Sequence, residues 1–365
     1  MVQACRELDR LHGILFLRIL AVESARTHNL PRWRAASVSL SHPVPSMRFG
    51  HSFRTCTALA FVGLCGLSPH GVSAQPASTA TYDVAMPPGA NFDKAKFRLW
   101  LPTGTAPVQG IAVLTPGSNG DGRDAVLDTV WQAFATTHHL ALVASQLTDK
   151  PHDQGFIEEY VNVSKGSGQA FLDALSTLAT NSKHPELAIA PLLLWGMSAG
   201  GQFNYEFVVW KPERVMAFVV NKGGIYYTAL APATARQVPG LLFVGGKDLA
   251  FRTNTIVGLF AVNRRAGALW ALADEPSAGH IVGRSRDVAL VFFEDVLALR
   301  RDRATSTLRT ITERSGFIGD LKTHSYEPLG EGKVPGYPTA WFPSERVAKA
   351  WRAMVTEQPN EAGHD

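Results

Sequence analysis

A serine stands between glycines in the segment Gly-Met-Ser-Ala-Gly at residues 196–200. Four apolar residues precede the segment, and a pattern typical of a helix follows it. A serine at such a strand-to-helix turn can attack a carbonyl carbon if a base takes its proton and preorganised donors stabilise the oxyanion. The spacing G-x-S-x-G therefore predicts Ser198 as a nucleophile, and the alternative is an ordinary tight turn.

Two further residues could supply the base and the acid that this serine needs. Of the seven histidines after residue 74, His280 is favoured because it follows the last expected strand in a loop of small residues, although it could be only a solvated loop histidine. Asp248 comes just past the strand expected at 240–246. Asp248 could instead cap the next helix, a common role of aspartate. Asp274 also ends a strand, but it lies only six residues before His280 and is the weaker choice.

The oxyanion donors are expected in the main chain. Ala199 directly follows the serine, and a glycine-rich loop at 116–122 follows an early strand. Glycines let a backbone approach a ligand closely, so we predict the N–H groups of Ala199 and Ser118 as the oxyanion hole, with Asn119 beside them in contact with substrate. A phosphate-binding loop is the rival interpretation, but this loop lacks the ending G-K-[ST].

These residues need a scaffold that brings the ends of several strands together. From residue 95 onward, apolar runs of strand length alternate with amphipathic stretches of helix length. This alternation predicts an α/β fold with a mostly parallel central sheet and helices on both faces. Strands are expected at 96–102 (as an edge strand), 110–117, 141–147, 191–196, 215–221, 240–246 and 268–273, and helices at 125–138, 168–180, 199–210, 252–265, 283–302 and 344–355.

The N-terminal region is typical of a leader rather than of a folded domain. Residues 47–74 have a basic start, an apolar run and the ending Val-Ser-Ala, which predicts a secretory signal peptide cleaved after Ala74. The rival leader at 11–22 is interrupted by Arg18. The apolar run at 55–67 could be a buried helix, but it is too short for a membrane span of roughly 20 residues. We therefore expect residues 1–46 to be an upstream extension outside the natural product and the protein to be exported, periplasmic or secreted, without stable membrane insertion.

Charge and cysteine content also depend on this leader. Residues 1–74 hold eight of the 35 basic residues and three of the 31 acidic ones, so the remainder has a net charge near −1. A near-neutral chain argues against a nucleic-acid partner, which calls for a basic surface. All three cysteines also lie before residue 74, which leaves no thiol nucleophile and no cysteine metal site. We expect a catalytic domain at 75–303 and a C-terminal extension at 304–365 that packs on it through the helix at 344–355.

The order Ser198, Asp248, His280 on alternating strands and helices resembles the α/β-hydrolase fold, over roughly residues 95–303. Within that fold, Pro-Gly-Ser-Asn-Gly at 116–120 stands where secreted esterases of the polyhydroxyalkanoate-depolymerase-like and feruloyl-esterase-like group have His-Gly followed by a small residue. Pro116 replaces that histidine here. Met197 stands where histidine or tyrosine often precedes the nucleophile.

The resemblance implies a serine esterase that forms an acyl-enzyme intermediate. Ser198 would attack the acyl carbon, His280 would relay the proton and Asp248 would orient the imidazole. No metal and no organic cofactor is implied. A serine peptidase uses the same constellation, and a non-catalytic binding module on a hydrolase scaffold is a third possibility; the sequence leaves both open, and it does not indicate an oligomeric state.

The expected substrate is a small-molecule or polymer-linked ester. Only about 19 residues, 222–240, connect two strands at the place where this fold often inserts a lid. A connection of that length cannot form a large cap, so an open site is expected, by analogy with the fold. Tyr226, Tyr227 and Trp195 could line the acyl pocket, with core packing the alternative for Trp195.

Overall fold

The computed structural model describes residues 80–104, 106–155, 157–302, 308–331 and 335–357. The upstream extension and the signal peptide, predicted within residues 1–74, lie outside the described residues and stay predictions. No helix in the described ranges is long and apolar enough to cross a bilayer.

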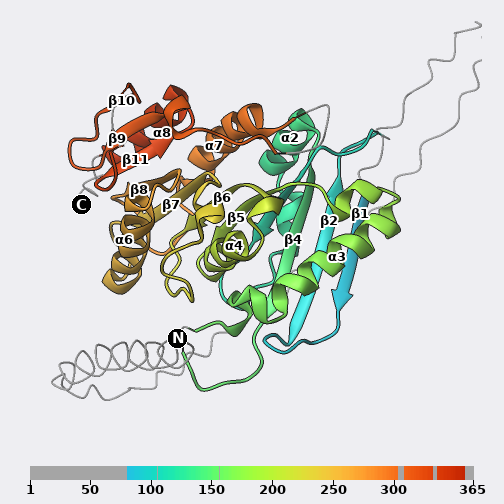
Figure 1. Cartoon of the computed structure of the whole chain (residues 1–365). Helices are drawn as coiled ribbons and strands as arrows, with labels where there is room; N and C mark the ends of the chain where they lie inside the picture. Colours follow the sequence, from blue (N-terminus) through green and yellow to red (C-terminus); the bar gives the residue numbers. More distant parts are fainter. Residues whose placement is uncertain (1–79, 105, 156, 303–307, 332–334, 358–365) are drawn as a thin grey trace, which may run out of the picture. The chain divides into compact units, whose positions relative to one another are not determined.

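One large sheet organises the structure (Figure 1). Its strand order is β1-β2-β4-β3-β5-β6-β7-β8. Strand β2 runs antiparallel to both of its neighbours, whereas all pairs from β4 to β8 are parallel. This order, with a single reversed strand next to one end, is the α/β-hydrolase topology, and it confirms the predicted fold. The strands are β1 Ala80–Met86, β2 Lys94–Leu101, β3 Ile111–Thr115, β4 Ala141–Thr148, β5 Leu192–Met197, β6 Val215–Asn221, β7 Gly240–Gly245 and β8 Trp270–Glu275.

Helices cover both faces of this sheet. Along β5 the apolar side chains alternate between two cores, with Leu192 and Leu194 in one and Leu193 in the other, because successive strand residues point to opposite faces. Helices α3 (Ser167–Ser182), α4 (Ala199–Trp210) and α6 (Ala250–Arg265) pack in the first core. Helices α2 (Thr129–His138), α7 (Ser285–Arg300) and α8 (Glu345–Val355) pack in the second.

The N-terminal edge of the sheet differs from the prediction. Residues 96–102 were expected to form an edge strand, but β2 lies inside the sheet, between β1 and β4. The edge is β1, which the apolar pattern did not reveal. Its side chains alternate between half-buried and exposed along the strand, so it lacks the continuous apolar run that marks the buried strands.

The connection between β6 and β7 is short and carries no large lid. It contains one four-residue helix, α5 (Ala233–Arg236). Its first part is tied to α4 by the buried carboxylate of Glu206, whose Oε1 accepts hydrogen bonds from the N–H groups of Tyr227 (2.7 Å) and Thr228 (2.9 Å).

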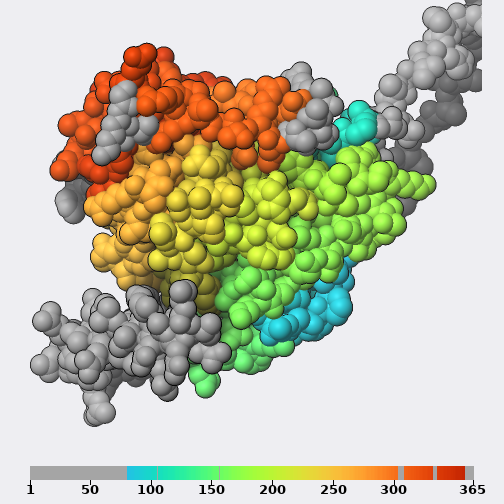
Figure 2. All heavy atoms as spheres, viewed as in Figure 1, coloured from blue at the N-terminus to red at the C-terminus, as the bar shows by residue number. Residues whose placement is uncertain are grey.

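A second, three-stranded sheet follows α7, in the order β10-β9-β11. It consists of β9 (Phe317–Asp320), β10 (Tyr326–Pro328) and β11 (Thr339–Phe342), and α8 follows it. Trp351 of α8 is fully buried, and its indole N–H donates a 2.8 Å hydrogen bond to the carbonyl of Leu272 in β8. Figure 2 shows these C-terminal residues, in red, beside the orange atoms of the preceding segment.

Candidate active site

Ser198 occupies a sharp turn between β5, which ends at Met197, and α4, which begins at Ala199. Its backbone angles are φ 53° and ψ −123°. A non-glycine residue in such a region costs of order 1–3 kcal/mol, and that cost is characteristic of functional sites. The flanking glycines allow the turn, because a Cβ on Gly200 would lie 2.3 Å from the carbonyl oxygen of Thr115, and one on Gly196 would lie 2.3 Å from that of Gly200.

The structure brings Ser198, His280 and Asp248 into one chain of hydrogen bonds. Nε2 of His280 lies 2.9 Å from Oγ of Ser198, and Nδ1 lies 2.8 Å from Oδ2 of Asp248. The three residues follow β5, β8 and β7. These strands are parallel, so their carboxyl ends lie at the same end of the sheet. Asp274, the weaker choice for the acid, is exposed and does not take this place.

Asp248 is held as an ionised acceptor. Its side chain is only 2% exposed, and Oδ1 accepts hydrogen bonds from the N–H of Leu249 (2.7 Å) and from Nη1 of Arg252 (3.1 Å). Burial alone would raise the pKa of Asp248, but the hydrogen bonds from His280, Leu249 and Arg252 outweigh it and hold the pKa below its usual value. An ionised carboxylate only accepts, so Nδ1 of His280 carries the proton and Nε2 is left to accept from the serine hydroxyl.

The loop predicted to supply an oxyanion donor lies against the nucleophile. A Cβ on Gly117 would be 3.6 Å from Cβ of Ser198, and the N–H of Gly120 closes the loop on the carbonyl of Gly117 at 3.0 Å. Within the described part of the chain, neither the N–H of Ser118 nor that of Ala199 donates a hydrogen bond to a protein acceptor. The role of both N–H groups as oxyanion donors stays a prediction.

Asn119 fixes this loop to the end of β4. Its Oδ1 accepts a 2.7 Å hydrogen bond from the N–H of Asp149, and its own N–H donates to the hydroxyl of Tyr160 at 3.3 Å. Its backbone φ is 54°, a conformation that asparagine tolerates better than most residues. Asn119 thus has a structural task in addition to the predicted contact with substrate.

A cavity of about 390 Å³ opens beside the same loop. Its walls join the predicted oxyanion loop to the segment that follows β4. The lining residues are Ser118, Asn119, Asp149, Lys150, Pro151, His152, Gln154, Gly155, Ile157 and Glu158.

The three aromatic residues predicted near the acyl pocket have different surroundings. Tyr227 is 45% exposed, and its hydroxyl donates at 3.3 Å to the carbonyl of Glu158, one of the residues that line that cavity. The ring of Tyr226 packs on Tyr205, with centroids 5.2 Å apart, and its hydroxyl is buried. Trp195 packs in the second core, the alternative considered for it.

Asn221 links the serine turn to the histidine loop, and the sequence analysis missed it. Its carbonyl accepts the N–H of Ser198 at 2.8 Å, and its Nδ2 donates to the carbonyl of Val282 at 3.3 Å. The one available signal is its position, since Asn221 is the only polar residue in the otherwise apolar run that forms β6.

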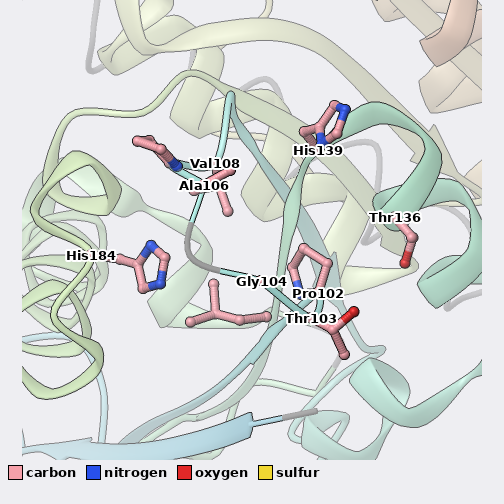
Figure 3. A pocket seen from close by; sticks show the side chains of 10 residues that line it. Pro102, Thr103, Gly104, Ala106, Val108, Thr136, His139 and His184 are labelled. Carbon is pink, nitrogen blue, oxygen red and sulfur yellow. The ribbon is translucent and has the colours of Figure 1, made fainter. Parts of the chain in front are cut away.

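Figure 3 shows a second cavity, of about 110 Å³, whose lining includes none of Ser198, Asp248 and His280. It is lined by the end of β2 and the segment between β2 and β3, and by Thr136, His139 and His184. It therefore lies where β3 and β4 begin, at the end of the parallel strands opposite to the one that carries Ser198. His184 is already bonded to Glu186 (Nδ1 to Oε1, 2.8 Å). In the ranges that the structure describes, no group of three or more His, Cys, Asp or Glu side chains could hold a metal ion.

Comparison with protein-family models finds no match, and comparison with curated proteins finds none either. Among solved structures, the chain is similar to the poly(3-hydroxybutyrate) depolymerase LpqC from Bordetella parapertussis, at 18% identity over 63% of this chain and 93% of that one, with a TM-score of 0.43. Esterase PE8 is 18% identical over 55% of this chain and 97% of its own, with a TM-score of 0.43. A putative dienelactone hydrolase from Klebsiella pneumoniae is 18% identical over 60% and 98%, with a TM-score of 0.41.

Proposed function

We propose that this protein is an exported serine esterase that hydrolyses carboxylic esters through an acyl-enzyme intermediate. One observation carries the proposal, namely the continuous hydrogen-bonded chain from Ser198 through His280 to Asp248. That chain places a hydroxyl, a base and a carboxylate in the order that nucleophilic acyl transfer requires.

In the first half-reaction, Oγ of Ser198 attacks the acyl carbon of the ester while its proton passes to Nε2 of His280. The ionised Asp248 stabilises the imidazolium that results. The N–H groups of Ala199 and Ser118 receive the oxyanion of the tetrahedral intermediate. When the intermediate collapses, the bond to the alcohol oxygen breaks, and His280 returns the proton to that oxygen.

In the second half-reaction, water replaces the alcohol. His280 takes a proton from the water as its oxygen attacks the acyl carbon, and the same main-chain donors receive the second oxyanion. When this intermediate collapses, the bond between the acyl carbon and Oγ of Ser198 breaks, His280 returns its proton to Oγ, and the carboxylic acid is released. The protein's own groups complete the cycle.

The substrate enters from an uncapped side. The connection between β6 and β7 forms no large lid, and the cavity of about 390 Å³ lies beside the Ser118 loop, with Tyr227 hydrogen-bonded to its lining residue Glu158. This arrangement suits a small ester, or an ester group that remains attached to a polymer.

Fluorophosphonate labelling with peptide mapping tests the nucleophile. We expect the mature protein to be labelled at Ser198, and the variants Ser198→Ala and His280→Ala to be unlabelled while circular dichroism shows them folded. A folded wild-type protein that takes up no probe would refute the serine hydrolase and favour a binding role.

Substrate preference is tested with a chain-length series of p-nitrophenyl acyl esters beside a set of aminoacyl anilides. The esterase proposal expects cleavage of the esters and not of the anilides. The reverse preference would identify a peptidase instead.

The proposed export is tested separately by N-terminal sequencing of the protein recovered from the periplasm or the medium. Cleavage after Ala74 places Gln75 first. A recovered protein that retains residues before Met47 would contradict both the predicted start and the predicted leader.

A further inference from the structure

A buried ion pair lies next to the candidate active site. Lys222 directly follows β6, and Glu275 ends β8; their side chains are 0% and 6% exposed. Nζ of Lys222 is 2.8 Å from Oε2 of Glu275, and it also donates to Oδ1 of Asn221 at 3.1 Å. Lysine and glutamate are almost never fully buried unless they are paired, and a buried pair adds little net stability over apolar residues of similar volume. Stability alone therefore does not account for this pair.

The second oxygen of Glu275 closes the loop that carries His280. Oε1 accepts a 2.7 Å hydrogen bond from the N–H of Arg284, where the chain enters α7. The loop at 276–284 therefore leaves Glu275 and returns to the carboxylate of the same residue. The main chain of the loop passes close to this carboxylate at Gly283, which has a φ of +56° and where a Cβ would lie 2.3 Å from Oε1 of Glu275. His280 is in the middle of this closed loop.

The lysine connects that loop to the serine turn. A Cβ on Gly245 would lie 3.0 Å from Cε of Lys222 and 2.8 Å from the carbonyl oxygen of Gly279, so the lysine stem passes near the residue before His280. The preceding residue, Asn221, accepts the N–H of Ser198. Lys222 and Glu275 thus join the strand end that holds the nucleophile to the loop that holds the base.

We propose that Lys222 and Glu275 are positioning residues that set the separation of His280 Nε2 from Ser198 Oγ. The inference rests on the proposed function, since it assigns the pair a role in that site. The pair suits this task because it offers directional donors and acceptors, while its opposite charges add no net charge beside the imidazole.

The expected consequence is a loss of rate rather than of binding. A misplacement of about 1 Å in a catalytic group can cost about 100-fold in rate. We expect Glu275→Gln and Lys222→Met each to lower kcat by about 10- to 100-fold, with KM for a p-nitrophenyl ester close to the wild-type value. The double variant leaves no unpaired buried charge, so we expect it to be the least destabilised of the three. Its kcat is also lowered, because methionine cannot donate the hydrogen bonds that Lys222 makes.

A matched control separates positioning from general stability. Arg264 and Glu313 form another pair with a buried cation, at 2.5 Å, in which Glu313 belongs to the C-terminal segment. Glu313→Gln should lower the melting temperature and leave kcat unchanged. All variants are made in the mature chain, and kcat and KM are measured well below the melting temperature of each.

Two results would contradict different claims. If the wild type is labelled at Ser198 while the folded double variant and either folded single variant keep the wild-type kcat, the positioning role is refuted and the esterase stands. If the folded wild type is not labelled by fluorophosphonate, the proposed function fails, and the positioning role fails with it.

Discussion

Nε2 of His280 lies 2.9 Å from Oγ of Ser198, although 82 residues separate the two along the chain. The parallel sheet brings the two side chains together, because the carboxyl ends of β5 and β8 lie at the same end of the sheet and the loops that follow these strands converge there. Asp248 fixes the other side of the imidazole at 2.8 Å. The three side chains thus form one continuous chain of hydrogen bonds in the structure.

Replacing the acid tests the role of that second hydrogen bond. In Asp248→Asn, the amide can donate to Nδ1, which moves the imidazole proton to Nε2 and leaves no base for Ser198. We expect kcat for a p-nitrophenyl ester to fall by about 10³- to 10⁴-fold with the fold intact. Asp274→Asn is the control, and it should keep the wild-type kcat. Equal losses in the two variants would show that Asp248 has no special role.

Two glycine substitutions should have opposite effects on stability. In Gly200→Ala, the new methyl group would lie 2.3 Å from the backbone oxygen of Thr115, which cannot move without separating β3 from α4. We expect a loss of about 3 kcal/mol or more in the free energy of unfolding. Gly258 is exposed within α6 with open space around it, so Gly258→Ala should gain about 1 kcal/mol. Urea titration of both variants measures the difference.

Glu206 should make the protein less stable as the pH rises. Burial raises the pKa of this carboxyl above its unfolded value of 4.5, partly offset by hydrogen bonds from Thr228 and Tyr227. The folded state therefore binds the proton more tightly, and stability falls as the pH rises from 4.5 through the raised pKa. Glu206→Gln should melt progressively higher than the wild type across that window, by about 2–4 °C for each kcal/mol gained.

The control for this trend is a carboxyl with the opposite shift. Burial would raise the pKa of Glu186, but the hydrogen bonds from His184 and from main-chain N–H groups lower it below 4.5. Its contribution to stability is present above pH 4.5 and is lost as the pH falls through the lowered pKa. Glu186→Gln should therefore melt lower than the wild type at neutral pH, with the gap closing in acid. If the difference in melting temperature from the wild type changed with pH in the same direction for both variants, the opposite pKa shifts of Glu206 and Glu186 would be contradicted.

The C-terminal helix should contribute to the core. Trp351 is fully buried and donates to the carbonyl of Leu272, so Trp351→Ala removes both packing and a hydrogen bond. We expect a loss of about 3–5 kcal/mol in the free energy of unfolding. Lys349→Ala, on the exposed side of the same helix, should change it by less than about 0.5 kcal/mol. A small effect of the tryptophan variant would show that α8 is dispensable.

The serine turn was predictable because its determinants are adjacent in the chain. The apolar residues of β5, the glycines on either side of Ser198 and the start of α4 lie within one short segment, and close packing at the turn makes the glycines necessary. The alternation of strands and helices then limited the acid and the base to the loops after later strands, where the structure places Asp248 and His280.

Other features depend on contacts that the local pattern does not encode. Lys222 and Glu275 are 53 residues apart, and only the strand order makes them neighbours. The same applies to β1, a segment with alternating half-buried and exposed residues that forms a strand by pairing with β2. Tyr226 and Tyr227 are adjacent in a loop without periodicity, so nothing in the sequence indicates that the first hydroxyl is buried and that the second ring is exposed.

The second sheet and α8 bear on how the molecule avoids self-association. β8 is the last strand of the large sheet, and the outer side of such a strand can pair with a strand from another chain. Here the indole N–H of Trp351 donates a hydrogen bond to the carbonyl of Leu272 in β8. The side chains of β11 and α8 also pack in the same core as those of β8. The C-terminal residues therefore cover the outer edge of β8, which limits its pairing with a strand from another chain.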